Sequence, residues 1–62
     1  MSLDEETVIR RAYAEASLAA KEKGLTGIRA MTAVLSATAK VATRVLGRQV
    51  LVDEVERVLG RA

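Results

Sequence analysis

The sequence predicts an all-α protein, in which an antiparallel helical hairpin is followed by a short third helix and the chain associates as a dimeric helical bundle. Three observations support this fold class. Half of the 62 residues are hydrophobic, and many of these are alanine, the residue with the highest helix propensity. Proline is absent, and the four glycines separate segments whose apolar residues recur with helical spacing. A chain of this length makes a single domain, residues 1–62.

The first helix is predicted at about residues 3–23. Ser2 and Glu5 match the S-x-x-E capping box, and the acidic residues at positions 4–6 suit the positive end of the helix dipole. Gly24 follows Lys21 and Lys23, and glycine suits the left-handed residue that ends a helix. Both ends of this helix are therefore marked in the sequence.

The apolar face of this first helix consists mostly of alanine, so a neighbouring helix can approach it closely. Leu18 is an exception, because it lies opposite that face. On the exposed side, Glu6 with Arg10 and Arg11 with Glu15 have the i,i+4 spacing of helical ion pairs. The apolar face comprises Val8, Ile9, Ala12, Tyr13, Ala16, Ala19 and Ala20.

The second helix is predicted at about residues 27–46, and the short connection before it predicts an antiparallel neighbour. Apolar residues cover nearly half of its circumference, which is more than the thin alanine face of the first helix can bury. Exposed apolar surface of this kind usually marks an interface, and a homodimer is the favoured state. The predicted self-association face comprises Ile28, Met31, Val34, Leu35, Val41, Ala42, Val45 and Leu46.

The segment after Gly47 has no single interpretation from periodicity. Residues 48–52 could form a turn, a strand or the start of a helix, and we favour a turn. Asp53 and Glu56 then fit a second capping arrangement, which places a third helix at about residues 53–59. Its apolar face comprises Val55, Val58 and Leu59.

The composition argues against an enzyme. Histidine and cysteine are both absent, which removes the commonest general base, the thiol nucleophile and the usual transition-metal ligands. Most carboxylates cluster at predicted helix starts, where capping explains them. The glycines at positions 24 and 27 match neither a P-loop nor a dinucleotide-binding fingerprint. We therefore expect no catalytic, cofactor-binding or metal-binding residues, and no cofactor.

The middle of the chain is locally basic, because no acidic residue occurs between Lys23 and Val52. A continuous second helix would present Arg29, Lys40 and Arg44 as a stripe, with Arg48 close behind it. One interpretation is a solvated face whose cations pair with acids of the first helix, such as Glu15 or Glu22. The alternative is a phosphate-binding surface, which a dimer would double.

Charged residues interrupt every apolar stretch, so no membrane span is predicted. The acidic N-terminus does not resemble a secretory signal, and we expect a cytoplasmic location. The sequence thus predicts a small, non-enzymatic, homo-oligomeric helical protein that acts as a protein–protein interaction, adaptor or regulatory module. The alternative is a dimeric nucleic-acid-binding protein that uses the basic face of its second helix.

Overall fold

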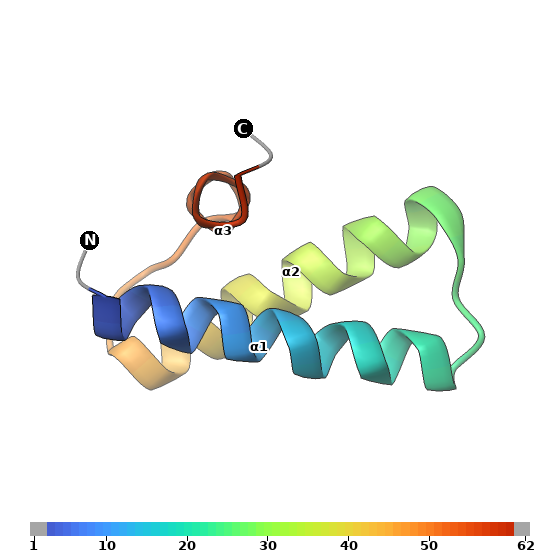
Figure 1. Ribbon diagram of the computed structural model, residues 1–62, viewed down its shortest axis with the longest axis horizontal. Helices are drawn as coiled ribbons and strands as arrows, with labels where there is room; N and C mark the ends of the chain where they lie inside the picture. Colours follow the sequence, from blue (N-terminus) through green and yellow to red (C-terminus); the bar gives the residue numbers. More distant parts are fainter. Residues whose placement is uncertain (1–2, 61–62) are drawn as a thin grey trace.

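The computed structural model describes residues 3–60, and every regular element in that range is a helix. Helix α1 spans Leu3–Glu22, α2 spans Gly27–Leu46 and α3 spans Val52–Val58 (Figure 1). The all-α prediction is confirmed, and the predicted bounds differ by one residue at the end of α1 and at both ends of α3. The predicted cap at Ser2 lies outside the described residues.

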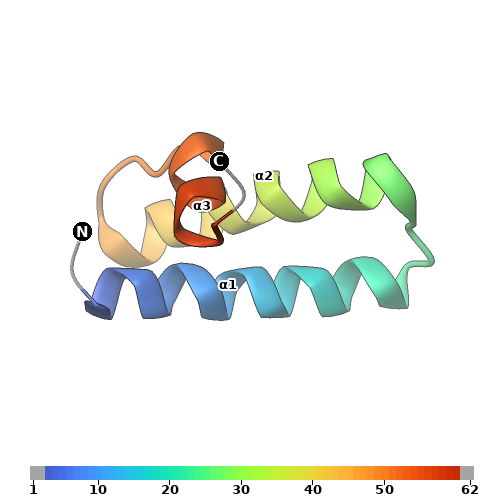
Figure 2. The ribbon, with the colours of Figure 1, turned by 45° about the horizontal axis from the view of Figure 1, so that its top comes forward.

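Helices α1 and α2 form an antiparallel hairpin, and α3 lies across one end of it (Figure 2). The turn between α1 and α2 depends on Gly24, whose φ of +77° is in the left-handed region. There the Gly24 N–H donates to the Lys21 carbonyl oxygen and the Leu25 N–H donates to the Ala20 carbonyl oxygen, each at 3.0 Å. These bonds satisfy carbonyl groups that the last turn of a helix leaves without intrahelical partners.

Helix α2 ends in a similar way at Gly47, which has a φ of +69° and donates its N–H to the Thr43 carbonyl oxygen. The chain then changes direction, and residues 48–51 form an irregular connection. The favoured turn at residues 48–52 is therefore confirmed except at Val52, which begins α3. The predicted cap at Asp53 is wrong, because the extended residue Leu51 precedes the helix without a side-chain cap bond.

The connection between α2 and α3 is attached to α2 by Thr43, and we call this contact the Thr43–Val50 lock. The Thr43 hydroxyl oxygen accepts a hydrogen bond from the Val50 N–H at 2.8 Å. The same hydroxyl lies 3.3 Å from the Val50 carbonyl oxygen and donates to it. Val50 is buried, so these bonds satisfy backbone groups that water would reach poorly.

The core forms where all three helices meet, and small side chains allow the helices to approach closely. Ile9 from α1 and Val55 from α3 are both fully buried. Thr38 is buried as well, and its hydroxyl donates to the Val34 carbonyl oxygen at 2.6 Å, so its polar group is satisfied. The buried cluster comprises Ile9, Leu35, Ala39, Ala42, Val50 and Val55, and the side chains of Tyr13, Leu46, Val52, Val58 and Leu59 pack against it.

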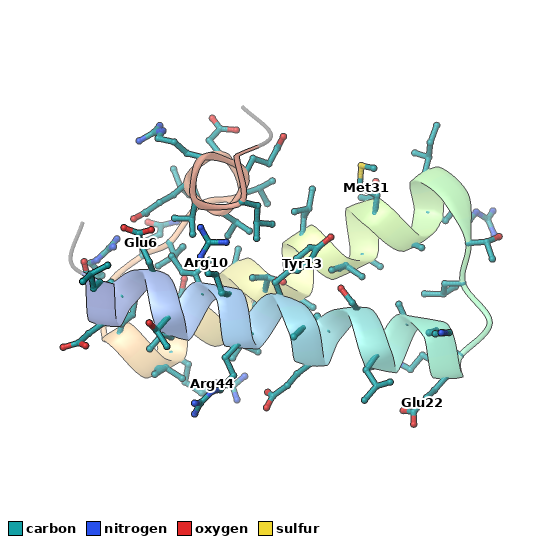
Figure 3. The ribbon with its side chains drawn as sticks, in the orientation of Figure 1. Glu6, Arg10, Tyr13, Glu22, Met31 and Arg44 are labelled. Atoms are coloured by element: carbon teal, nitrogen blue, oxygen red, sulfur yellow. The ribbon has the colours of Figure 1, made fainter. Side chains whose placement is uncertain are left out.

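Helix α3 is also held by a polar contact from α1. Arg10 donates from Nη2 to the Val58 carbonyl oxygen at 2.8 Å, at the negative end of the α3 dipole. Figure 3 shows the Arg10 and Glu6 side chains on the side of α1 that carries α3. No Glu6–Arg10 ion pair forms, and that prediction was wrong because the guanidinium of Arg10 binds α3 instead.

Candidate interaction surfaces

The structure divides the predicted self-association face into buried and exposed residues. Ile28, Met31 and Val45 are 83%, 52% and 61% exposed, respectively. The remaining five residues are core or partly covered: Val34, Leu35 and Ala42 are buried inside the protomer, and Val41 and Leu46 are half-buried. The buried three offer almost no surface to a partner while the hairpin and α3 stay packed. Leu35 and Ala42 belong to the buried cluster that contains Val55 of α3, so they are used within the protomer.

A shallow hollow of about 260 Å³ lies between α1 and α2, and we call it the interhelical groove. Its floor is apolar, because Val8 and Ala12 of α1 meet Val41 and Val45 of α2 there. Polar side chains of α1 border it: Thr7, Arg11 and Glu15. The groove therefore combines a partly exposed apolar floor with one cation and one anion from the same helix.

A second hollow of about 240 Å³ lies nearer the interhelical turn, where Tyr13 of α1 and Met31 of α2 both contribute to its lining. Figure 3 shows both of these side chains on the side of the hairpin that carries α3. Helix α3 covers only one end of that side (Figure 2). The exposed residues Ile28 and Met31 thus lie toward the uncovered end.

Arg48 is bound within the protomer, although the sequence grouped it with the basic stripe. Its Nη1 and Nη2 atoms donate to the two carboxylate oxygens of Glu54 at 3.1 and 2.7 Å, and its Nε donates to Glu5 Oε2 at 3.2 Å. Arg48 therefore connects α3, which it binds through a bidentate pair with Glu54, to α1, which it binds through a single bond to Glu5. The hydrogen bonds from Arg48 lower the pKa of Glu54, and the same bonds raise the pKa of Arg48.

The other three predicted cations are unpaired within residues 3–60. Arg29, Lys40 and Arg44 are exposed, and none donates to a carboxylate of that range. The predicted pairing of this stripe with Glu15 or Glu22 does not occur. In Figure 3, Arg44 and Glu22 lie on the side of the hairpin away from α3.

Lys40 and Arg44 also border an open groove of about 710 Å³ between α2 and the connection to α3. Hydroxyl and amide groups stand beside these cations in its lining, from Ser36, Thr43 and Gln49. A groove with two unpaired cations can accommodate a phosphate or another anion, and the neutral donors for it would come from Ser36 and Gln49, because the Thr43 hydroxyl donates to Val50. It is wide and shallow, which suits an extended ligand better than an enclosed small molecule.

The described part of the chain contains no cluster of three or more side chains that could hold a metal ion. Within residues 3–60, no helix combines the length and the apolar composition needed to cross a lipid bilayer. Comparisons with protein-family models, with curated proteins and with solved structures give no match.

Proposed function

We propose that this protein is a small, non-enzymatic helical module that acts by self-association, with a homodimer as its functional state, in an adaptor or regulatory role. The observation that carries the proposal is the interhelical groove, whose apolar floor includes Val45, an exposed residue of α2. A partner would remove that floor from water, and such burial is the main favourable contribution to association. A cytoplasmic location is part of the same proposal, as the chain contains no cysteine for disulfide bonds.

Chain length gives a second, independent reason to propose association. A domain of about 60 residues buries only roughly 60% of the surface that its unfolded chain exposes, which leaves its stability marginal. This chain has no cysteine for disulfide bonds and no histidine or cysteine for a zinc site. Association with a second copy is the remaining common way to add buried apolar surface.

Sedimentation equilibrium at micromolar concentration tests the proposal, with a dimer as the expected species. Folding and association should be coupled, so the melting temperature should rise with protein concentration. A 6.6 kDa species at all concentrations, together with a melting temperature that does not depend on concentration, would exclude self-association.

Nucleic-acid binding is the second candidate function, and the three unpaired cations of α2 support it. Their charges are not neutralised by described acidic residues, and Lys40 and Arg44 border the same open groove. Binding of duplex or single-stranded DNA should be detectable at low salt and should weaken steeply as salt is added, because phosphate contacts release counterions. Fluorescence anisotropy with a labelled oligonucleotide measures both properties.

Charge reversal gives the matched control for this second candidate. Lys40→Glu with Arg44→Glu should abolish binding, whereas Lys21→Glu, an exposed lysine of α1 outside the basic stripe, should reduce it only modestly. If the original protein shows no binding at low ionic strength and micromolar concentration, the nucleic-acid candidate is excluded.

A further inference from the structure

Helix α1 has an uncovered side along its whole length. Figure 2 shows α2 and α3 on the same side of α1, so nothing in the protomer packs on the opposite side. Residues three or four positions apart form an exposed row there, and we call this row the outer stripe. It comprises Asp4, Thr7, Arg11, Glu15, Leu18 and Glu22. The outer stripe borders the interhelical groove, since Thr7, Arg11 and Glu15 belong to both.

We infer that two copies of the chain pair through this outer stripe, with their α1 helices antiparallel across a two-fold axis between Arg11 and Glu15. The inference rests on the proposed self-association and specifies its surface. A two-fold interface must be self-complementary. If residue i of one copy contacts residue j of the other, then residue j of the first copy also contacts residue i of the second. Arg11 and Glu15 have opposite charges and are equally distant from the axis. Each Arg11 thus faces the partner's Glu15.

The protomer leaves both of these charges available for a partner. Arg11 and Glu15 have the spacing of an intrahelical ion pair, but they form none in the structure. Both side chains are exposed, and neither side chain makes a hydrogen bond or ion pair with another residue of the range 3–60. The antiparallel arrangement supplies two equivalent ion pairs across the interface.

The same axis accounts for Leu18, which points away from the protomer core and is 60% exposed. Leu18 and Val8 lie five residues on either side of the axis, which is about 7.5 Å along the helix at a rise of about 1.5 Å per residue. The partner's Leu18 therefore reaches the level of Val8 along α1, beside the outer stripe rather than in the interhelical groove. Pairing along the outer stripe removes one exposed leucine of each copy from water.

The ends of the outer stripe place Asp4 opposite the partner's Glu22, which is a pair of like charges. These residues lie about 13 Å from the axis along the helix. Packed helices cross at an angle, so their surfaces separate toward the ends of the contact. The interaction is therefore concentrated near the axis, where Arg11, Glu15 and Leu18 lie.

A charge-swap series measured by sedimentation equilibrium tests the surface. Arg11→Glu and Glu15→Arg should each weaken the dimer about tenfold, because each replaces two attractive pairs with two repulsive ones. The double variant Arg11→Glu with Glu15→Arg restores opposite charges across the axis, so its dissociation constant should return to within about twofold of the original. Circular dichroism at matched concentrations checks that each variant remains helical.

Leucine substitutions provide a second series that does not depend on charge. Leu18→Ala should weaken the dimer at least tenfold, because each dimer loses two buried leucine side chains. Leu51→Ala is the matched control, since Leu51 is 57% exposed but lies in the connection to α3. It should leave the dissociation constant unchanged.

The possible outcomes separate this surface from self-association itself. If the original protein dimerises while the single charge variants and Leu18→Ala dimerise equally well, the outer stripe is not the interface and the proposed function still stands. If the single variants weaken the dimer and the double variant does not recover, the two-fold pairing of Arg11 with Glu15 is wrong. A monomeric original protein overturns both proposals.

Discussion

Replacing Thr43 with valine should destabilise the protein by about 1–3 kcal/mol, because the Thr43–Val50 lock would lose both of its hydrogen bonds. Valine has nearly the shape of threonine, so the packing around position 43 should change little. The Val50 N–H, now 2.8 Å from the Thr43 hydroxyl oxygen, would be left without its acceptor in a buried segment. An unsatisfied buried backbone donor costs about 1–3 kcal/mol.

This loss is large for so small a protein. At roughly 0.05–0.15 kcal/mol per residue, a chain of this length has a total stability of about 3–9 kcal/mol. Urea unfolding followed by circular dichroism measures the change directly, and the protein concentration must be held constant because association also affects stability. A loss of about 2 kcal/mol should lower the melting temperature by roughly 8–16 °C.

Thr43→Ser is the matched control, because serine keeps the hydroxyl and removes only a methyl group. It should cost about 1 kcal/mol or less, and the helix propensities of threonine, serine and valine are similar enough not to dominate the comparison. Thr43→Val should therefore be the more damaging of the two changes. If valine proves as stable as threonine while serine is worse, packing rather than hydrogen bonding attaches the connection to α2, and the reasoning is refuted.

Three further predictions concern the core, the ion pairs and the α1–α2 contact. Ile9→Ala should cost about 2–5 kcal/mol in urea unfolding, because Ile9 is fully buried where the three helices meet. The hydrogen bonds from Arg48 lower the pKa of Glu54 in the folded protein. The pair therefore stabilises the fold fully at pH values above the pKa of glutamate in the unfolded chain, about 4.3. This stabilisation is lost as the pH falls through the lower pKa of Glu54 in the folded protein. Glu54→Gln should accordingly flatten the acidic limb of a plot of melting temperature against pH, and an unchanged limb would contradict the assignment. Ala42→Leu should destabilise by about 1–3 kcal/mol through overpacking, because Ala42 is fully buried in the cluster that contains Ile9 of α1, whereas Ala33→Leu at an exposed position of the same helix should be nearly neutral.

The sequence was a good guide to the helices because their ends depend on local chemistry. Gly24 adopts the left-handed conformation that its position after a helical segment predicted, and Gly47 adopts the same conformation at the end of α2. The same local signals placed the hairpin turn and the break before the third helix. The start of α3 was misassigned, since an acidic residue in a first turn and an acidic cap have the same sequence signal.

The role of Arg48 was not predictable from periodicity. On a helical wheel it extends the basic stripe of α2, but Gly47 turns the chain and directs Arg48 toward Glu5 and Glu54. Glu5 is more than forty residues away in sequence, and no local pattern indicates such a contact. The same limit applies to Leu35 and Ala42, because periodicity identifies an apolar face but does not identify which neighbour covers it.

The two candidate functions use different helices of the hairpin, and this separation makes their dependence on each other testable. The outer stripe belongs to α1, whereas Arg29, Lys40 and Arg44 belong to α2 and are exposed. A dimer paired through α1 carries two copies of the basic stripe in one particle, with twice the charge available to a nucleic acid. Counterion release makes affinity depend steeply on the number of phosphates contacted. A variant such as Leu18→Ala, which changes no charge, should therefore weaken nucleic-acid binding only if the dimer is the binding species. Equal affinity of this variant and the original protein would mean that a single basic stripe binds alone.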